Sequence, residues 1–231
     1  MSTWHISRLV AAKDLRVEWR SRVLINQVMP FAAIVMVMFA FALDSDAVLE
    51  RVAPGLVWLA TVFSLLVMVQ RSFAVETADG ALDALRVAGV STAGVFIGKA
   101  IALAVQLLAL ELVLLFSAVV LYRTQLRADD QLAGLALLAA TVALATISLA
   151  FVGTLYGGLA AGVKGRETLL PLLLLPVVAP VLIAATRATE AGFGVGKTAV
   201  HEGWPWVALL ATFAVMFGVG GSLAFGALID E

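Results

Sequence analysis

The sequence predicts an all-α integral membrane protein, a bundle of six membrane-spanning helices, and three observations support this. Of its 231 residues, 62% are hydrophobic and 13% are charged, whereas soluble domains have about 45–50% apolar and about 25% charged residues. The mean hydropathy is +1.05. Six apolar runs each approach or exceed the roughly 20 residues that a helix needs to cross about 30 Å of hydrocarbon. We expect one membrane domain, because no internal repeat or low-complexity linker marks a second.

The six predicted spans are marked with different clarity. The fifth is the least regular, because Pro171, Pro176 and Pro180 remove three backbone donors from it. Such a helix must be kinked or partly unwound. The predicted spans are residues 23–43, 54–70, 95–122, 131–153, 169–186 and 204–228.

Basic residues are divided unequally between the two sides of these spans. If the N-terminus is cytoplasmic, ten lysines and arginines lie inside and five lie outside, which is the bias of the positive-inside rule. Both termini are therefore expected in the cytoplasm. Because no short apolar core with a small-residue cleavage site follows the basic N-terminal segment, no cleavable signal peptide is expected. Five of the inside residues precede the first span: Arg8, Lys13, Arg16, Arg20 and Arg22.

The segment before the first span, residues 4–20, has the pattern of a helix that lies in the membrane interface. Its apolar residues recur near helical spacing, basic residues are interleaved with them, and Trp4 and Trp19 stand at its ends. The alternative is a positively charged tail that only sets the topology.

A polar segment, residues 71–99, separates the second and third spans on the predicted cytoplasmic side. Within it, Val75, Ala78, Leu82 and Leu85 recur at three- and four-residue steps, which predicts a short amphipathic helix. This helix either binds a partner or is a solvated loop helix against the headgroups. Three residues near its two membrane ends are interpreted as anchors: Arg71, Phe73 and Lys99.

Acidic residues give the predicted helix a second face. Glu76, Asp79 and Asp83 lie beside the apolar positions. Gly80 lies in the middle, where glycine costs about 1 kcal/mol relative to alanine. Close approach of another backbone would explain a glycine there.

Sequence motifs for catalysis or for a directly bound cofactor are weak. The chain has no cysteine, which excludes disulfides and thiolate metal sites. The run 194–198 resembles the end of a phosphate-binding loop, but Ala191 stands where that motif needs glycine. His5 and His201 are predicted on opposite sides of the membrane. We therefore expect a non-catalytic chain.

Two features inside the predicted spans stand out. Glu111 lies mid-span, where a charge costs roughly 3 kcal/mol, and with Gln106 it forms a polar strip. It is a structural, hydrogen-bonded glutamate, a part of a translocation path, or a dimer contact. The fourth span ends in several glycines, which predicts close helix packing. The turn 164–167 after it is a second, shorter candidate for partner contact.

Taken together, the residues resemble the CcmB family, the membrane subunit of the haem-exporter ABC system for cytochrome c maturation. The resemblance extends over most of the chain. The matching positions are Asp14, Leu15, Glu18, Arg20, Pro54, Gly55, Trp58, Arg71, Phe73, Glu76, Gly80, Leu82, Leu85, Gly98, Lys99, Gly153, Thr154, Arg166, Leu169, Leu170, Pro171, Leu175, Pro176 and Pro180.

The resemblance implies a six-span permease of the type-2 ABC exporter class in the bacterial inner membrane. Two copies of the chain would work with two copies of a separate CcmA-like ATPase, so that ATP binds in the partner. The family also assembles with CcmC-like and CcmD-like membrane proteins and acts on a haem chaperone of the CcmE type. Haem is handled by the complex, and no nucleic acid is involved.

The resemblance also assigns residues. An interfacial N-terminal helix carries Asp14, Glu18 and Arg20. The loop between the second and third spans carries a coupling helix that seats on the ATPase, at Glu76, Asp79, Gly80, Leu82, Asp83, Leu85 and Arg86. Two alternatives remain, a type-2 permease for another substrate and a membrane scaffold that transports nothing.

Overall fold

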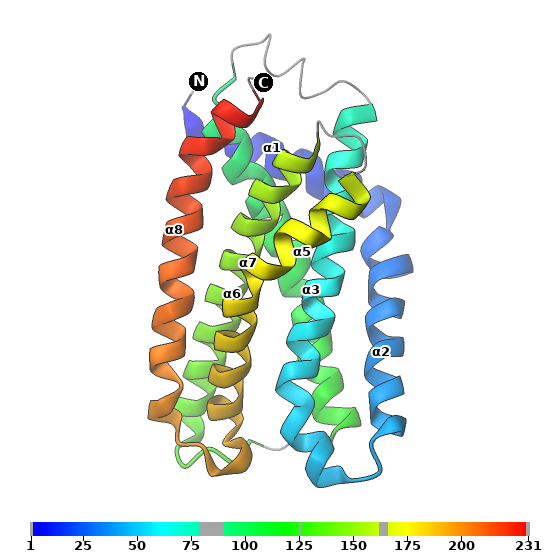
Figure 1. Ribbon diagram of the computed structural model, residues 1–231, viewed down its shortest axis with the longest axis vertical. Helices are drawn as coiled ribbons and strands as arrows, with labels where there is room; N and C mark the ends of the chain where they lie inside the picture. Colours follow the sequence, from blue (N-terminus) through cyan, green and yellow to red (C-terminus); the bar gives the residue numbers. More distant parts are fainter. Residues whose placement is uncertain (1, 79–89, 125, 162–165, 230–231) are drawn as a thin grey trace.

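The computed structural model describes residues 2–78, 90–124, 126–161 and 166–229, which form a bundle of long helices (Figure 1). None of these residues forms a β-strand. Six helices among them are long and apolar enough to span a membrane, so the all-helical, six-span prediction is confirmed for this part of the chain. The candidate spans are Leu24–Ala42, Asp46–Ala74, Thr92–Leu121, Gln131–Ala161, Thr168–Phe193 and Val200–Gly226.

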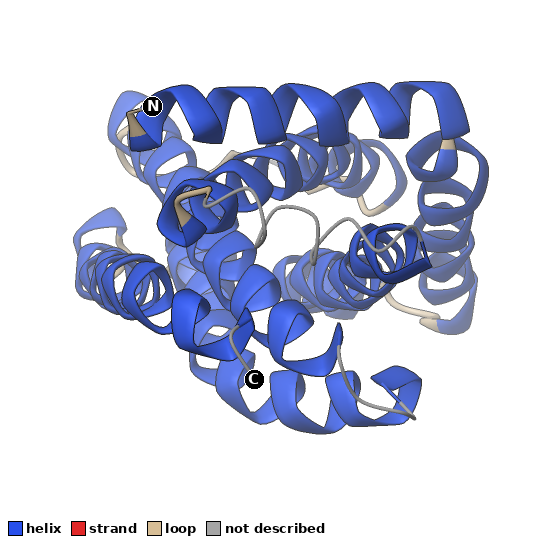
Figure 2. Cartoon of the chain, turned by 90° about the horizontal axis from the view of Figure 1, so that it is seen from above, coloured by secondary structure: helices blue, strands red, loops and turns tan. Residues whose placement is uncertain are grey.

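The first helix, α1 (Thr3–Ser21), lies across the ends of the other helices (Figure 2). Its buried residues are Ile6, Ser7, Val10 and Ala11, and it packs on α5 (Thr92–Leu121). Trp4 and Trp19 remain exposed at its ends. The helix expected over residues 4–20 is therefore present, and its exposed tryptophans suit the headgroup region of a bilayer.

A π-helical turn, Leu24–Val28, leads from α1 into α2 (Met29–Ala42). Together they form the first span, close to the predicted residues 23–43. In the middle of α2, the Met36 carbonyl oxygen accepts a hydrogen bond from the Tyr122 hydroxyl at 2.8 Å. This bond joins α2 to the end of α5.

The second span, α3 (Asp46–Ala78), is the centre of the bundle. Most of its membrane-length window is buried, and it packs against α2, α5, α6 and α7. It begins eight residues before the predicted residue 54 and contains Pro54 in its interior. The prediction was short because hydropathy detects the apolar part of a helix, whereas α3 extends beyond it with Asp46 and Glu50.

The fourth span, α6 (Gln131–Ala161), contacts its neighbours through glycines. A Cβ atom at Gly157 would lie 2.5 Å from side-chain atoms of Phe73 and Val69 on α3, and one at Gly158 would lie 2.5 Å from the Phe225 ring. Real Cβ contacts are longer, so only glycine permits this approach. The close packing predicted from the small residues is confirmed.

The fifth span, α7 (Arg166–Phe193), is continuous through its three prolines but bent, and its first part lies oblique to the rest (Figure 1). Of the two predicted outcomes, the structure therefore shows a kink without an unwound segment. The straighter half is joined to α3 by a buried hydrogen bond from Trp58 Nε1 to Thr189 Oγ1 at 2.9 Å.

The last helix, α8 (Trp204–Ile229), follows two short 3-10 turns, Val195–Lys197 and Val200–Glu202. It returns the chain to the end of the bundle where α1 lies (Figure 1). The same end holds the last residues of α3 and the first residues of α5. His5 of α1 and His201 of the second 3-10 turn lie at opposite ends of the bundle, as expected.

Candidate functional site

The candidate site is centred on the side chain of Lys99, near the start of α5. Its ammonium group lies 3.2 Å from Asp14 Oδ2 on α1 and 3.3 Å from Ser72 Oγ on α3. The ammonium nitrogen also lies 4.6 Å from the centre of the Phe73 ring, within the range of a cation–π contact. One side chain thus holds together α1, the end of α3 and the start of α5.

The Lys99 side chain is only 2% exposed and that of Asp14 is 13% exposed. A charge removed from water is tolerated in a protein when an opposite charge and hydrogen-bond partners compensate it. Lys99 has each kind of compensation from a different helix. We infer that the position of each helix depends on the other two.

Two glycines of α5 let α1 approach this site. A Cβ atom at Gly98 would lie 2.7 Å from both the Ser7 carbonyl oxygen and Val10 Cβ, and one at Gly94 would lie 2.9 Å from the Ile6 side chain. Any larger residue would push α1 away from α5. Because Gly98 directly precedes Lys99, the same turn of α5 provides both the close approach and the cation.

The sharp change of direction after α1 is fixed by Glu18. Its carboxylate accepts a hydrogen bond from the Leu24 backbone N–H at 2.6 Å, and its carbonyl oxygen accepts one from the Arg22 N–H at 2.8 Å. Arg22 itself has a φ of 52°, in the left-handed region. The side chain of Glu18 therefore caps the first span from the helix before it.

The residues expected on the interfacial helix have different environments. Asp14 pairs with Lys99 and also with Lys13 at 2.9 Å. Glu18 is the cap just described, and Arg20 is exposed. Asp14 thus contacts α5 and Glu18 contacts the turn after α1, whereas Arg20 is exposed.

Two of the residues interpreted as anchors are buried in the bundle. Phe73 was expected near the end of the second span and Lys99 near the start of the third, and the structure buries both side chains there, with Phe73 4% exposed. Phe73 packs on α6 at Gly157 and beneath the Lys99 ammonium. The side chain of Arg71 is exposed.

The predicted coupling helix falls mostly outside the described residues. Glu76 belongs to the last turn of α3, so this part of the segment continues the second span. The other coupling residues lie outside the described ranges: Asp79, Gly80, Leu82, Asp83, Leu85 and Arg86. Residues 164 and 165 of the turn 164–167 also lie outside them. The coupling helix and its partner contact stay predictions.

Glu111 is fully buried between α5 and α6, where it hydrogen-bonds to Thr146 Oγ1. The Thr146 hydroxyl also donates to the Val142 carbonyl oxygen at 2.6 Å. A hydroxyl has one proton, so an uncharged carboxyl group that donates to Thr146 satisfies both contacts. The contact joins α5 to α6, and which of the three roles Glu111 has stays a prediction.

Two features of the described ranges bear on metal and phosphate binding. They hold no group of three or more His, Cys, Asp or Glu side chains placed to bind a metal ion. The run resembling a phosphate-binding loop forms a 3-10 turn with left-handed Gly194 and Gly196, after a helix and not after a strand. It is therefore a chance match.

Comparison with known proteins agrees with the resemblance seen in the sequence. The family model described as CcmB protein matches residues 5–230. The chain is 31% identical over 187 residues to heme exporter protein B of Rhodobacter capsulatus, covering 80% of this chain and 83% of the relative. It is 26% identical over 211 residues to heme exporter protein B of Pseudomonas aeruginosa, covering 87% of each.

Proposed function

The chain belongs to the CcmB family, and we propose that it is the membrane permease subunit of an ABC transporter complex for cytochrome c maturation. In this proposal it is a non-catalytic subunit of the type-2 exporter class. A separate chain binds and hydrolyses ATP, and this chain converts closure of that ATPase into a rearrangement of its own helices. The relatives are named heme exporters, so haem, directly or on a chaperone, is the proposed cargo.

The proposed assembly contains two copies of this chain and two CcmA-like ATPase subunits in the inner membrane. CcmC-like and CcmD-like membrane proteins complete it, and ATP-driven release of a haem-loaded CcmE-like chaperone is its output. Both termini are proposed to be cytoplasmic. The ten-to-five bias of basic residues supports that orientation.

The observation that carries the proposal is the Lys99 site. The segment proposed to contact the ATPase connects α3 to α5, and Lys99 bonds to Ser72 near the end of α3 from its own place near the start of α5. Its pair with Asp14 extends the connection to α1. A displacement of the connecting segment would therefore move three helices together instead of one.

The proposed contact with the ATPase uses two kinds of side chain. Leu82 and Leu85 would fill an apolar groove, and Asp79, Asp83 and Arg86 would make the polar contacts around it. Buried apolar anchors surrounded by charges are the usual arrangement of an interface, in which the charges mainly set the orientation and the rate of association.

The proposal is tested by reversing the acidic charges of the segment. In Asp79→Lys/Asp83→Lys, we expect the tagged chain to recover much less ATPase subunit in mild detergent and to stimulate ATP hydrolysis less. Asp230→Lys/Glu231→Lys makes the same charge change at a different place after α8 and should recover the ATPase like the unmodified chain. Equal recovery and equal stimulation in both variants would contradict the coupling assignment.

A second experiment distinguishes an ATP-driven transporter subunit from a membrane scaffold that transports nothing. If the complex only assembles maturation proteins, an ATPase partner that cannot hydrolyse ATP should still permit chaperone release. We expect release to stop with that partner while the assembly remains intact on affinity purification.

A further inference from the structure

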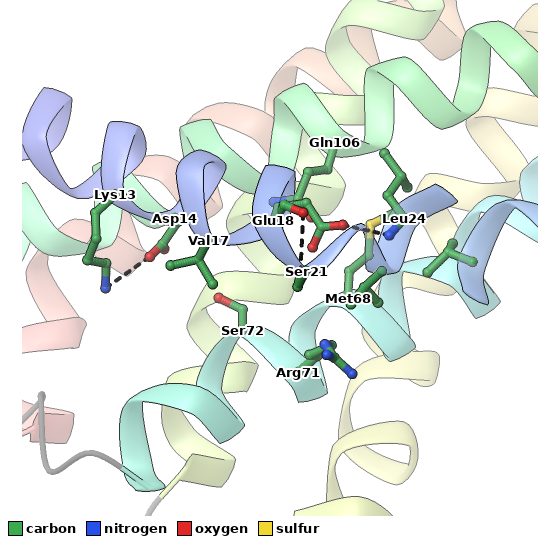
Figure 3. A pocket seen from close by; sticks show the side chains of 12 residues that line it. Lys13, Asp14, Val17, Glu18, Ser21, Leu24, Met68, Arg71, Ser72 and Gln106 are labelled. Atoms are coloured by element: carbon green, nitrogen blue, oxygen red, sulfur yellow. Dashed lines mark hydrogen bonds and ion pairs between the residues drawn. The ribbon is translucent and has the colours of Figure 1, made fainter. Parts of the chain in front are cut away.

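A small cavity lies beneath α1 where the chain turns into the first span (Figure 3). Its volume is about 90 Å³, well below the ~300–1,000 Å³ of pockets that hold drug-sized ligands. A group of a few heavy atoms fits, and a macrocycle does not. The walls come from α1, the π-helical turn, α3 and α5, and the residues used below are Ser72, Arg71, Gln106, Glu18, Val28 and Met68.

The polar groups of this cavity include three hydrogen-bond donors without an acceptor. Across the described part of the chain, the Arg71 guanidinium and the Gln106 amide form no hydrogen bond or ion pair. The Ser72 hydroxyl accepts from Lys99 and donates to none of the described residues. Figure 3 shows Arg71 beside Ser72 and Met68 at this cavity.

The acidic groups nearby are already occupied. The Glu18 carboxylate accepts the Leu24 N–H, and Asp14 pairs with two lysines, Lys13 and Lys99. The charged residues of the lining are two cations, Lys13 and Arg71, and two anions, Asp14 and Glu18, and the buried Lys99 ammonium lies beside the cavity on Asp14 and Ser72. Because both carboxylates already have partners, while Arg71, Ser72 and Gln106 still have donors to offer, the site favours an anion.

The depth of the cavity indicates which anion. Leu24 in its wall is the first residue of one candidate span, and Arg71 lies three residues before Ala74, the last residue of another. The cavity therefore lies near the ends of these two spans, and Gln106 reaches it from inside the span Thr92–Leu121. Val28 and Met68, deeper in the same two spans, form the apolar part of its wall.

We propose that this cavity binds the phosphate group of a membrane phospholipid. Arg71 donates to the phosphate oxygens, a pairing for which the guanidinium fork is well suited. Ser72 and Gln106 supply further donors, and the acyl chains remain outside the cavity in the surrounding bilayer. The bound lipid joins the turn after α1 to α3, next to the Lys99 site, with which it shares Ser72. Basic pockets between membrane helices bind lipid headgroups in this way.

The test measures lipid on the purified full-length chain and needs no transport partner. The protein is stripped with detergent, titrated with palmitoyl-oleoyl phosphatidylglycerol and examined by native mass spectrometry. We expect one tightly held phospholipid per chain, and in Arg71→Gln a roughly tenfold to hundredfold weaker affinity, the loss of one charged hydrogen-bond pair. Arg16→Gln is the matched control, because Arg16 is an exposed arginine of α1 outside this cavity. It should bind lipid like the unmodified chain.

Three outcomes overturn the proposal. The first is equal lipid affinity in Arg71→Gln and the unmodified chain. The second is an equal loss in Arg16→Gln, which would indicate general surface charge. The third is inorganic phosphate displacing the lipid at a comparable concentration, which would identify a soluble anion as the ligand.

Discussion

Lys99 Nζ lies 3.2 Å from Asp14 Oδ2, although the two residues are 85 positions apart in the chain. Lysine reaches this carboxylate from a buried position on α5, while Asp14 lies on a helix that crosses the end of the bundle. The pair therefore couples the position of α1 to the position of α5.

Removing the ammonium group should destabilise the bundle. In Lys99→Met the apolar stem remains, but Asp14 loses its buried partner. We expect the free energy of unfolding to fall by about 2–4 kcal/mol. This is somewhat below the usual cost of breaking a fully buried pair, because Lys13 still contacts Asp14. The measurement is unfolding by sodium dodecyl sulfate in mixed micelles. Lys13→Met is the control, since its side chain is 47% exposed, and should change stability by less than about 1 kcal/mol.

The pair itself is isolated by adding Asp14→Asn and the double variant. We expect the two effects to be non-additive by about 1–3 kcal/mol, as for residues in direct contact. Additive effects would mean that Lys99 acts through Ser72 and Phe73 and not through Asp14.

Gly98→Ala should separate α1 from α5. The new Cβ would lie 2.7 Å from the Ser7 carbonyl oxygen, and backbone cannot give way as a side chain tip does. Overpacking of this kind costs about 1–3 kcal/mol, and a spin label on α1 should become more mobile. Gly220→Ala on α8 is the matched control, because nothing lies within 4 Å of its Cβ position. It should leave stability equal or up to about 1 kcal/mol higher.

Trp58→Phe should weaken the contact between α3 and the straight half of α7. Trp58 is 1% exposed, and its indole N–H donates to Thr189 Oγ1, whose own proton goes to the Ala185 carbonyl oxygen. Losing the indole N–H donor and part of the ring should lower the free energy of unfolding by about 2–3 kcal/mol. Trp19→Phe, at an 81% exposed site, should change stability by less than about 0.5 kcal/mol. Equal effects in the two variants would refute the inferred role of the hydrogen bond.

The spans and the crossing helix could be predicted because their signals are local. The apolar residues that contact lipid form a continuous run in the sequence, so the run alone locates the span. The expected third span, 95–122, differs from α5 by only three residues at its start and one at its end. The beginning of α3 was missed for the same reason. Charged residues continue a helix beyond the membrane without any hydropathy signal to mark it.

The partner of Lys99 could not be predicted, because the signal for it is not local. Asp14, Glu18 and the acidic residues of 76–83 were all expected on the same side, and nothing in the order of residues chooses among them. One clue was available. Lys99 directly follows Gly98, and a glycine inside a helix indicates that another backbone comes close, which argues against an exposed anchor at the next position.

Glu111 gives the last prediction, which concerns its protonation. Its Oε2 contacts Thr146 Oγ1, which has one proton to share between Glu111 and the Val142 carbonyl oxygen, and its Oε1 has no partner among the described residues. A protonated carboxyl group donates where an ionised one cannot. Glu111→Gln keeps a neutral donor of the same shape, so we expect its stability to stay within about 1 kcal/mol of the unmodified chain.

Thr146→Val removes the partner at nearly constant volume, which leaves a buried carboxyl group without an acceptor and should cost about 1–3 kcal/mol. At neutral pH the infrared spectrum should contain a carboxylic acid band that Glu111→Gln lacks. If Glu111→Gln is as damaging as Thr146→Val, or if that band is missing from the unmodified chain, the carboxyl group is ionised. Its role would then involve charge, in a translocation path or at a second copy of the chain, and not a structural hydrogen bond between α5 and α6.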